Sequence, residues 1–98
     1  MPGMMDSPKT HRLRAWFSGR VQGIGFRYST LQVSKGYEVT GYVKNLLDGR
    51  VELEAEGQKS EVEAFLAALQ DEMGDFIRET EVNWNQVSKP RYQQFIIQ

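Results

Sequence analysis

The chain has no cysteine and little proline or histidine, and each shortage narrows what it can be. Without thiols there are neither disulfides nor thiolate metal sites, and nothing points to an oxidising compartment. The single histidine, His11, has no plausible partner in the sequence, so we assign it no metal or acid-base role. Two of the three prolines, Pro2 and Pro8, lie in residues 1–10, where no hydrophobic period is visible. We expect this segment to be a flexible tail.

Long apolar runs are also absent. No run approaches the ~18 residues that a membrane-spanning helix requires. Residues 1–10 lack the apolar core of a secretory signal. We therefore expect a soluble cytoplasmic protein with no membrane partner.

The remaining residues, 11–98, predict one domain of strands and two helices. Leu13, Ala15 and Phe17 alternate with polar residues, which is typical of a strand with one buried face. Asp48-Gly49 is a strong hairpin signal, and the spacing of Ser60 and Glu63 predicts a capping box. After the first strand, which starts near His11, the predicted elements are a helix over Phe26–Lys35 ended by Gly36, strands over Tyr37–Lys44 and Arg50–Glu56, a helix from the capping box to Gly74, and strands around Ile77–Trp84 and Tyr92–Ile97.

This order of elements predicts an α+β fold with the βαββαβ arrangement plus a terminal strand. Such a chain places two helices on one face of a mainly antiparallel sheet. In the third strand, Glu52, Glu54 and Glu56 alternate with apolar residues, and we expect this acidic stripe to face solvent. The aromatic residues Trp16, Tyr28, Tyr42, Trp84 and Phe95 are interpreted as core or strand-face residues. Tyr28 directly follows Arg27 and could border a substrate pocket there.

The stretch from Gly19 to Arg27 carries the chemistry. Glycines at positions 19, 23 and 25 allow successive backbone N–H groups to converge on one point, which makes a concavity for anions. If a helix starts near Phe26, its unpaired N–H groups and dipole point into the same space. The guanidinium of Arg27 can meet two oxygens of a phosphoryl group at once. This stretch therefore predicts a phosphate-binding loop.

The charge distribution agrees with an anion site without proving one. The net charge is −1, but residues 1–50 carry eight Lys or Arg against three Asp or Glu, and residues 51–98 carry four against ten. The basic half contains the glycine loop, where a positive field would attract a phosphorylated substrate. The same charge distribution is explained equally well if the charged residues simply cover two solvent-exposed faces of the domain. The absence of a concentrated basic run argues against a nucleic-acid partner.

Two segments, GRVQGIGFR at residues 19–27 and GYVKNLLDGRVE at residues 41–52, resemble the signature segments of the acylphosphatase family. The resemblance extends over roughly residues 12–98. It implies a ferredoxin-like α/β sandwich that hydrolyses small acyl phosphates to a carboxylate and inorganic phosphate. It also implies a monomer that needs neither a metal nor another cofactor. Ser29, Thr30 and Ser34 depart from the usual pattern of the first helix and could loosen it.

The resemblance also assigns roles to residues. Arg27 would bind the phosphoryl group and Asn45 would orient the attacking water. The amide of Asn45 can accept from water and donate to a phosphoryl oxygen. The phosphate-binding loop would comprise Arg20, Val21, Gln22, Gly23 and Ile24, and the structural glycines would be Gly19, Gly25 and Gly49. Inorganic phosphate or a similar anion would bind at the same loop.

Two other functions compete with this one. The run Gly23 to Tyr28 faintly resembles an RNA-recognition signature, but that signature belongs on a strand, and here the run leads into a predicted helix. The stronger rival is a non-catalytic accessory module that binds an acyl or carbamoyl phosphate. The presence of both Arg27 and Asn45 favours an enzyme over this module.

Overall fold

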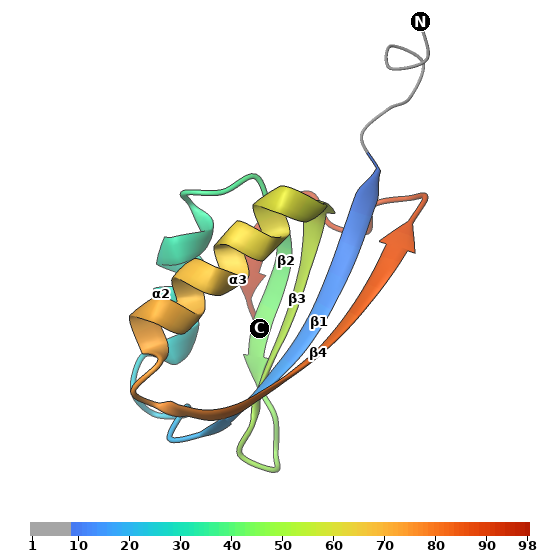
Figure 1. The fold of residues 1–98 in the computed structure, drawn as a ribbon. Helices are drawn as coiled ribbons and strands as arrows, with labels where there is room; N and C mark the ends of the chain where they lie inside the picture. Colours follow the sequence, from blue (N-terminus) through green and yellow to red (C-terminus); the bar gives the residue numbers. More distant parts are fainter. Residues whose placement is uncertain (1–8) are drawn as a thin grey trace, which may run out of the picture.

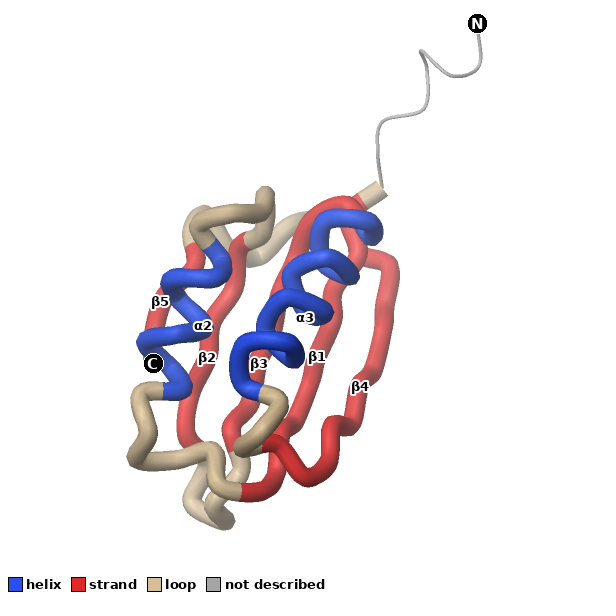
Figure 2. Tube along the Cα trace, turned by 60° about the vertical axis from the view of Figure 1, so that its left-hand side comes forward, coloured by secondary structure: helices blue, strands red, loops and turns tan. Residues whose placement is uncertain are grey.

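A five-stranded sheet carries two helices on one face in the computed structural model, which describes residues 9–98 (Figures 1 and 2). The elements are β1 (Thr10–Gly19), α2 (Phe26–Ser34), β2 (Thr40–Asn45), β3 (Val51–Gln58), α3 (Lys59–Met73), β4 (Ile77–Val87) and β5 (Phe95–Ile97). The predicted tail, residues 1–10, lies outside the described residues except for Lys9 and Thr10, and Thr10 already belongs to β1.

The strands lie in the order β4-β1-β3-β2-β5. β3 pairs antiparallel with both β1 and β2, β4 pairs antiparallel with β1, and β5 alone is parallel to its neighbour β2. The predicted ferredoxin-like fold, with its short terminal strand and its helices on one face, is confirmed. No helix within residues 9–98 is long and apolar enough to cross a membrane.

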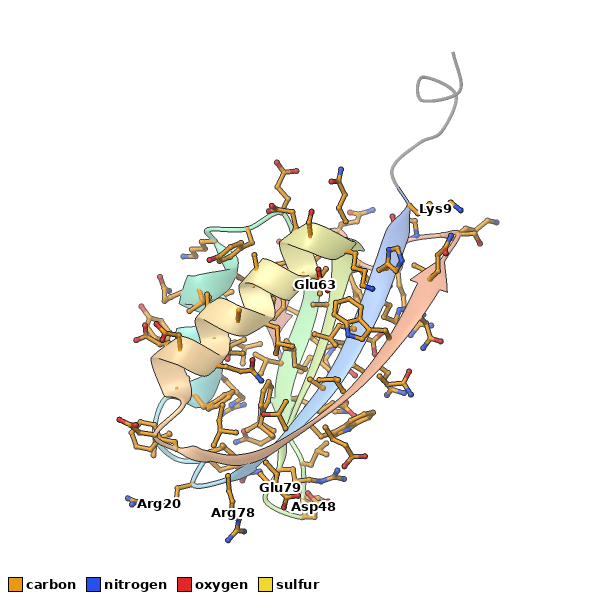
Figure 3. The ribbon with its side chains drawn as sticks, in the orientation of Figure 1. Lys9, Arg20, Asp48, Glu63, Arg78 and Glu79 are labelled. Carbon is orange, nitrogen blue, oxygen red and sulfur yellow. The ribbon has the colours of Figure 1, made fainter. Side chains whose placement is uncertain are left out.

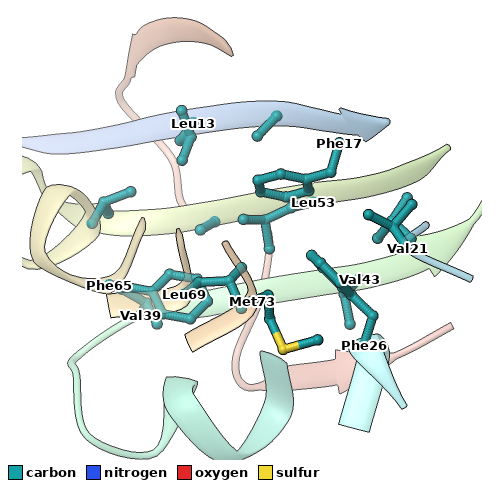
Figure 4. Packing of buried hydrophobic residues seen from close by; sticks show 14 residues of the cluster. Leu13, Phe17, Val21, Phe26, Val39, Val43, Leu53, Phe65, Leu69 and Met73 are labelled. Carbon is teal, nitrogen blue, oxygen red and sulfur yellow. The ribbon is translucent and has the colours of Figure 1, made fainter. Parts of the chain in front are cut away.

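The apolar core fills the layer between the sheet and the helices (Figure 4). Alternate residues of the inner strands point into it, as the period of two predicts. On α3 the core residues recur at helical spacing, so that one face of this helix is buried. The fully or almost fully buried members are Leu13, Ala15, Phe17, Val43, Val51, Leu53 and Ala55 from the strands, Val21 and Phe26 from the loop after β1 and the start of α2, and Val62, Phe65, Leu69 and Met73 from α3.

The acidic stripe on β3 does not face solvent, so that prediction was wrong. Glu52, Glu54 and Glu56 are 7%, 2% and 2% exposed, although they lie on the sheet face without helices. The sequence period shows that these residues share a face, but it cannot show what covers that face. Here the long side chains of the neighbouring strands and of the segment after β4 fold over the carboxylates.

Each of these carboxylates lies opposite a basic or aromatic residue of the neighbouring strand β1. Arg12 is paired in register with Glu56, Arg14 with Glu54, and Trp16 with Glu52. We call the three glutamates and their partners the carboxylate ladder. Its ion pairs join Arg12 Nη2 to Glu56 at 2.6 Å, Arg12 Nε to Glu54 at 3.2 Å and Arg14 Nε to Glu54 at 3.3 Å. Glu52 accepts hydrogen bonds from Trp16 Nε1 at 3.0 Å and Tyr42 Oη at 2.7 Å, and Glu54 accepts one from Tyr92 Oη at 2.9 Å. Oppositely charged cross-strand pairs stabilise a sheet, and buried carboxylates need such partners.

The start of α3 also differs from the prediction. The helix begins at Lys59, one residue before the predicted cap Ser60, and its N-cap Gln58 makes no side-chain capping bond. β3 runs to Gln58, so the chain passes from strand to helix without a loop in which a serine cap could form. The capping box is therefore not used. Glu61 instead accepts a hydrogen bond at 2.8 Å from the backbone N–H of Glu38.

Other boundaries shifted by a few residues. β4 continues to Val87, and β5 is only Phe95–Ile97. Tyr92, predicted to start the last strand, lies outside it, and its hydroxyl donates to Glu54. β2 begins at Thr40 rather than Tyr37, whose ring instead packs against Phe65 with centroids 6.2 Å apart.

Two of the three polar residues that could loosen α2, Thr30 and Ser34, form side-chain hydrogen bonds within it. Thr30 is fully buried and donates to the Phe26 carbonyl at 2.8 Å, and Ser34 donates to the Leu31 carbonyl at 2.6 Å. Their small side chains are therefore satisfied where they are buried. Nothing in these contacts points to a loose helix.

Removing the central carboxylate of the ladder should destabilise the fold strongly. We expect Glu54→Ala to lower the free energy of unfolding by about 3 kcal/mol, because Arg12 would keep a largely buried charge without one of its partners. Urea unfolding followed by circular dichroism measures this. The matched control is Glu81→Ala on the exposed face of β4, which should change stability by less than ~0.5 kcal/mol. Equal effects of the two variants would contradict the role of the ladder.

The same ladder predicts loss of stability at both ends of the pH scale. Burial would raise the pKa of Glu52, but hydrogen bonds from Tyr42 and Trp16 and the nearby Lys44 and Arg14 hold it below its ordinary value. Its contribution is therefore present above the unfolded pKa of about 4.3 and is lost as pH falls through the lower folded value. Burial and the hydrogen bond to Glu52 raise the pKa of Tyr42. Its contribution is present below about pH 10 and is lost as pH rises through the folded pKa.

Unfolding free energies measured by urea titration from pH 2 to pH 12 should show a plateau with a decline on each side. Glu52→Gln should flatten the acid decline, and Tyr42→Phe should flatten the alkaline one. An acid decline of unchanged slope in folded Glu52→Gln would show that other carboxyl groups are responsible.

Candidate functional site

The ends of β1 and β2 meet at one edge of the sheet, which brings the two sequence motifs together. β3 is antiparallel to both strands, so β1 and β2 run in the same direction on either side of it. Phe17 and Asn45 are both paired with Val51, so they lie level with each other across the sheet. The glycine loop leaves β1 two residues after Phe17. It therefore starts beside Asn45.

A cavity of about 190 Å³ lies at this edge and is open to solvent. It is lined by Val21, Gly23, Gly25, Phe26, Arg27, Tyr28, Asn45 and Ile97. Arg27 and Asn45, the two predicted catalytic residues, thus share one cavity although 18 positions separate them in the sequence. Arg27 carries the only charged side chain of this lining.

The backbone of the loop takes the conformation that its glycines allow. Gly23 and Gly25 have φ angles of 80° and 81°, in the left-handed region that other residues rarely adopt. Gly25 is the N-cap of α2, and the first hydrogen bond of the helix runs from Ser29 N–H to the Gly25 carbonyl at 2.9 Å. Within residues 9–98, the N–H groups of residues 21–24 have no hydrogen-bond partner. They are available to an anion.

Arg20 does not belong to this set of free donors. Its backbone N–H donates to the Phe76 carbonyl at 2.9 Å, and its side chain lines a different hollow with Arg78. Figure 3 shows both arginine side chains directed away from the body of the molecule. The prediction that Arg20 contributes an N–H group to the cradle was therefore wrong. The reason is Gly19, whose φ of 124° lets the chain approach Phe76 and Arg78 so closely that a Cβ atom would collide with both backbones.

Gln22 has a role that the sequence reasoning missed. Its side-chain amide donates to two backbone carbonyls of the β2–β3 turn, Leu46 at 2.8 Å and Arg50 at 2.9 Å. These two bonds tie the glycine loop to the turn that follows Asn45. Neither the Gln22 side chain nor that of Ile24 lines the cavity. Because both acceptors are backbone atoms, no residue type in the turn reveals this tie in advance.

Arg27 stands on the first turn of α2, held by its neighbour Phe26. Phe26 is 2% exposed, and its ring packs against Phe17 with centroids 5.3 Å apart. Arg27 itself is half-buried and donates from Nη1 to the backbone carbonyl of Gln98 at 3.0 Å. A guanidinium has five N–H donors, so this bond orients the side chain and leaves donors for a ligand.

Asn45 ends β2 and precedes a tight turn. The turn is closed by hydrogen bonds from Leu46 N–H to the Arg50 carbonyl at 2.8 Å and from Gly49 N–H to the Leu46 carbonyl at 3.2 Å. Asp48 accepts from the backbone and the side chain of Arg50 at 3.0 and 2.9 Å, and these bonds hold its pKa below the ordinary value. This carboxylate is therefore committed to the turn, and Gly49 supplies the positive φ of 96° that the turn requires.

Fold and cavity together define a class, namely small α+β domains with a candidate anion site where the first strand passes into the first helix. Comparison with known proteins narrows this class. The acylphosphatase family model matches residues 13–97. The chain therefore belongs to the acylphosphatase family.

Individual relatives agree with this family. An acylphosphatase from Syntrophotalea carbinolica is 49% identical over 61 residues, which cover 62% of this chain and 66% of the relative. One from Lactiplantibacillus plantarum is 36% identical over 82% of this chain and 89% of the relative. A crystal structure of an acylphosphatase from Bacillus subtilis matches with a TM-score of 0.77 and 30% identity, over 89% of this chain and 97% of that one. The match to the first relative thus leaves about a third of its length uncovered.

Cutting the Gln22 tie should disturb the site without unfolding the domain. In Gln22→Ala, we expect hydrolysis of acetyl phosphate to slow by about tenfold, because the loop and Asn45 lose their common support and small misplacements of reacting groups are costly. Steady-state kinetics together with thermal unfolding measures both effects. Gln86→Ala on β4 is the control, because Gln86 is exposed and far from this edge. Wild-type rates in Gln22→Ala would show that the tie is dispensable.

Proposed function

We propose that this chain hydrolyses the carboxyl–phosphate bond of small acyl phosphates, with Arg27 binding the phosphoryl group and Asn45 orienting the attacking water. One observation carries the proposal: Arg27, Asn45 and two glycine-loop residues with unpaired backbone N–H groups, Val21 and Gly23, line one cavity. Membership of the acylphosphatase family supports the reaction type. The monomeric state and the cytoplasmic location remain predictions from the sequence.

The reaction suits a site of this composition. The oxygen of water attacks phosphorus, the bond from phosphorus to the acyl oxygen breaks, and the electron pair leaves with the carboxylate. Water's protons pass to the phosphate product and to solvent. Because a carboxylate is a good leaving group at neutral pH, no general acid is needed to protonate it. Positioning and stabilisation of charge are then the main tasks of the protein.

Each part of the cavity can take one of these tasks. The N–H groups of Val21, Gln22, Gly23 and Ile24 and the N-terminus of α2 surround the phosphoryl oxygens. Arg27 supplies the positive charge and pairs with two of those oxygens. Asn45 accepts a hydrogen bond from the attacking water through its amide oxygen. An aspartate in its place would add a negative charge beside the substrate.

Phosphate release from acetyl phosphate tests the proposal. We expect wild type to turn over in the presence of a chelator, and Arg27→Ala and Asn45→Ala each to lose at least ~10²-fold in kcat/KM while remaining folded. The matched controls are Arg78→Ala and Asn85→Ala, which remove an arginine and an asparagine from exposed positions on β4.

Three outcomes would be informative. Loss of activity in the two site variants but not in the controls supports the assigned roles. Equal losses in site and control variants would refute them. Binding of phosphate by wild type without any turnover would favour the second reading, a non-catalytic module that binds acyl or carbamoyl phosphates.

A further inference from the structure

A second hollow, of about 490 Å³, lies where the end of β1 meets the start of β4, and it is open to solvent. It shares no lining residue with the cavity that contains Arg27 and Asn45. Its lining comes from the end of β1, the following loop residue and the four residues that lead into β4: Gly19, Arg20, Asp75, Phe76, Ile77 and Arg78. The hollow is therefore a separate place on the surface, and two arginines line it.

The first of these arginines, Arg20, is held through its backbone. Its N–H donates to the Phe76 carbonyl at 2.9 Å. Phe76 and Ile77 are half-buried and pack against the hydrophobic core, so they form a fixed floor beneath the hollow. The base of the Arg20 side chain is thus fastened to this floor, whereas the side chain itself is exposed.

The second arginine, Arg78, is turned into the hollow by an irregularity of the sheet. The register of β1 with β4 shifts so that Ser18 is paired with Glu79 and Gly19 with Ile77. Arg78 is consequently the extra residue of a β-bulge, and a bulge redirects the side chain that it carries. Figure 3 shows Arg20 and Arg78 at the same edge of the molecule, both directed outward.

Neither guanidinium group is neutralised by a partner. The salt bridges and side-chain hydrogen bonds formed among residues 9–98 involve neither Arg20 nor Arg78. Glu79 follows Arg78 in the sequence but lines a different hollow, together with Arg50. Asp75 contributes one carboxylate to the lining without pairing with either arginine. Two positive charges and one negative charge thus leave the hollow with an excess of positive charge.

The two guanidinium groups indicate what kind of ligand fits. Each presents a planar fork of donors that matches the oxygens of one phosphoryl group. A ligand that uses both must offer neighbouring oxyanion groups, and a hollow of about 490 Å³ has room for more than one. It must also outweigh the repulsion of Asp75, which favours a high density of negative charge. A chain of linked phosphoryl groups meets both conditions.

We propose that Arg20 and Arg78 form a second anion site, separate from the cavity of Arg27 and Asn45, that binds a polyphosphate chain. The phosphoryl units are the recognised chemistry, whether the chain is inorganic or belongs to a nucleotide. This site goes beyond the proposed hydrolase function and does not depend on it.

Calorimetry with tripolyphosphate tests the site in the Arg27→Ala background, in which the first cavity has lost its charged side chain. We expect this protein still to bind tripolyphosphate. Adding Arg78→Ala or Arg20→Ala should weaken binding by about tenfold, because charge-assisted hydrogen bonds from a guanidinium are lost. The control is Lys89→Ala, which removes a positive charge just beyond the far end of β4 and should leave the affinity unchanged. Unchanged affinity in both arginine variants would overturn the proposal.

Asp75 provides a variant with the opposite effect. Asp75→Asn removes the carboxylate that opposes the anion, so tripolyphosphate binding should tighten by about threefold at low ionic strength. The gain should shrink as salt is added, since salt screens charges at an exposed site. A folded Asp75→Asn protein that binds no more tightly than its parent would contradict binding in this hollow.

NMR locates the ligand without requiring turnover. Tripolyphosphate should shift the Nε–H signals of Arg20 and Arg78, and inorganic phosphate at equal concentration should shift them less. Binding without movement of these signals would refute the site. Adenosine triphosphate distinguishes the sources of the chain: affinity equal to that of tripolyphosphate supports recognition of the phosphoryl units alone, whereas clearly tighter binding supports a nucleotide whose base also contacts the hollow. Failure of wild type to hydrolyse acetyl phosphate would refute the proposed function and leave these results unaffected.

Discussion

The position of β3 between β1 and β2 is the constraint on which the rest of the structure depends. Its apolar residues face the helices, and its three glutamates face the other side. Arginines on β1 pair with these carboxylates, so the strand is held on both faces. Because β3 is antiparallel to both neighbours, the ends of β1 and β2 reach the same edge. The cavity lies at that edge because of this pairing.

The far face of the sheet also contributes to the site, although it lies behind the core. Arg91 donates from its backbone to Glu56 at 2.8 Å, and Tyr92 donates to Glu54 at 2.9 Å. These bonds fasten the segment after β4 across the sheet before it forms β5. That strand then delivers Ile97 and Gln98 beside Arg27. A charge network remote from the cavity thus places two of the groups around it.

A loop built on glycine has the freedom to bind an anion but no rigidity of its own. Its support comes from outside: Phe26 anchors the start of α2 in the core, and Gln22 bonds to the carbonyls of the β2–β3 turn. Fixed donors that need no rearrangement when a substrate binds are what electrostatic catalysis requires. The rigid parts of the fold therefore compensate for the flexible residues that the anion site needs.

By itself the sequence determined the order of elements, the hairpin at Asp48-Gly49 and the two motifs, because periodicity and turn chemistry are local. It also predicted that Arg27 and Asn45 act together, through family resemblance rather than through geometry. Only the tertiary structure decided that Glu52, Glu54 and Glu56 are buried, that Arg20 is excluded from the cradle, and that Gln22 and Ile97 border the site. Those outcomes depend on which strands and segments become neighbours in the fold, and a local sequence pattern does not specify which distant residues it will contact.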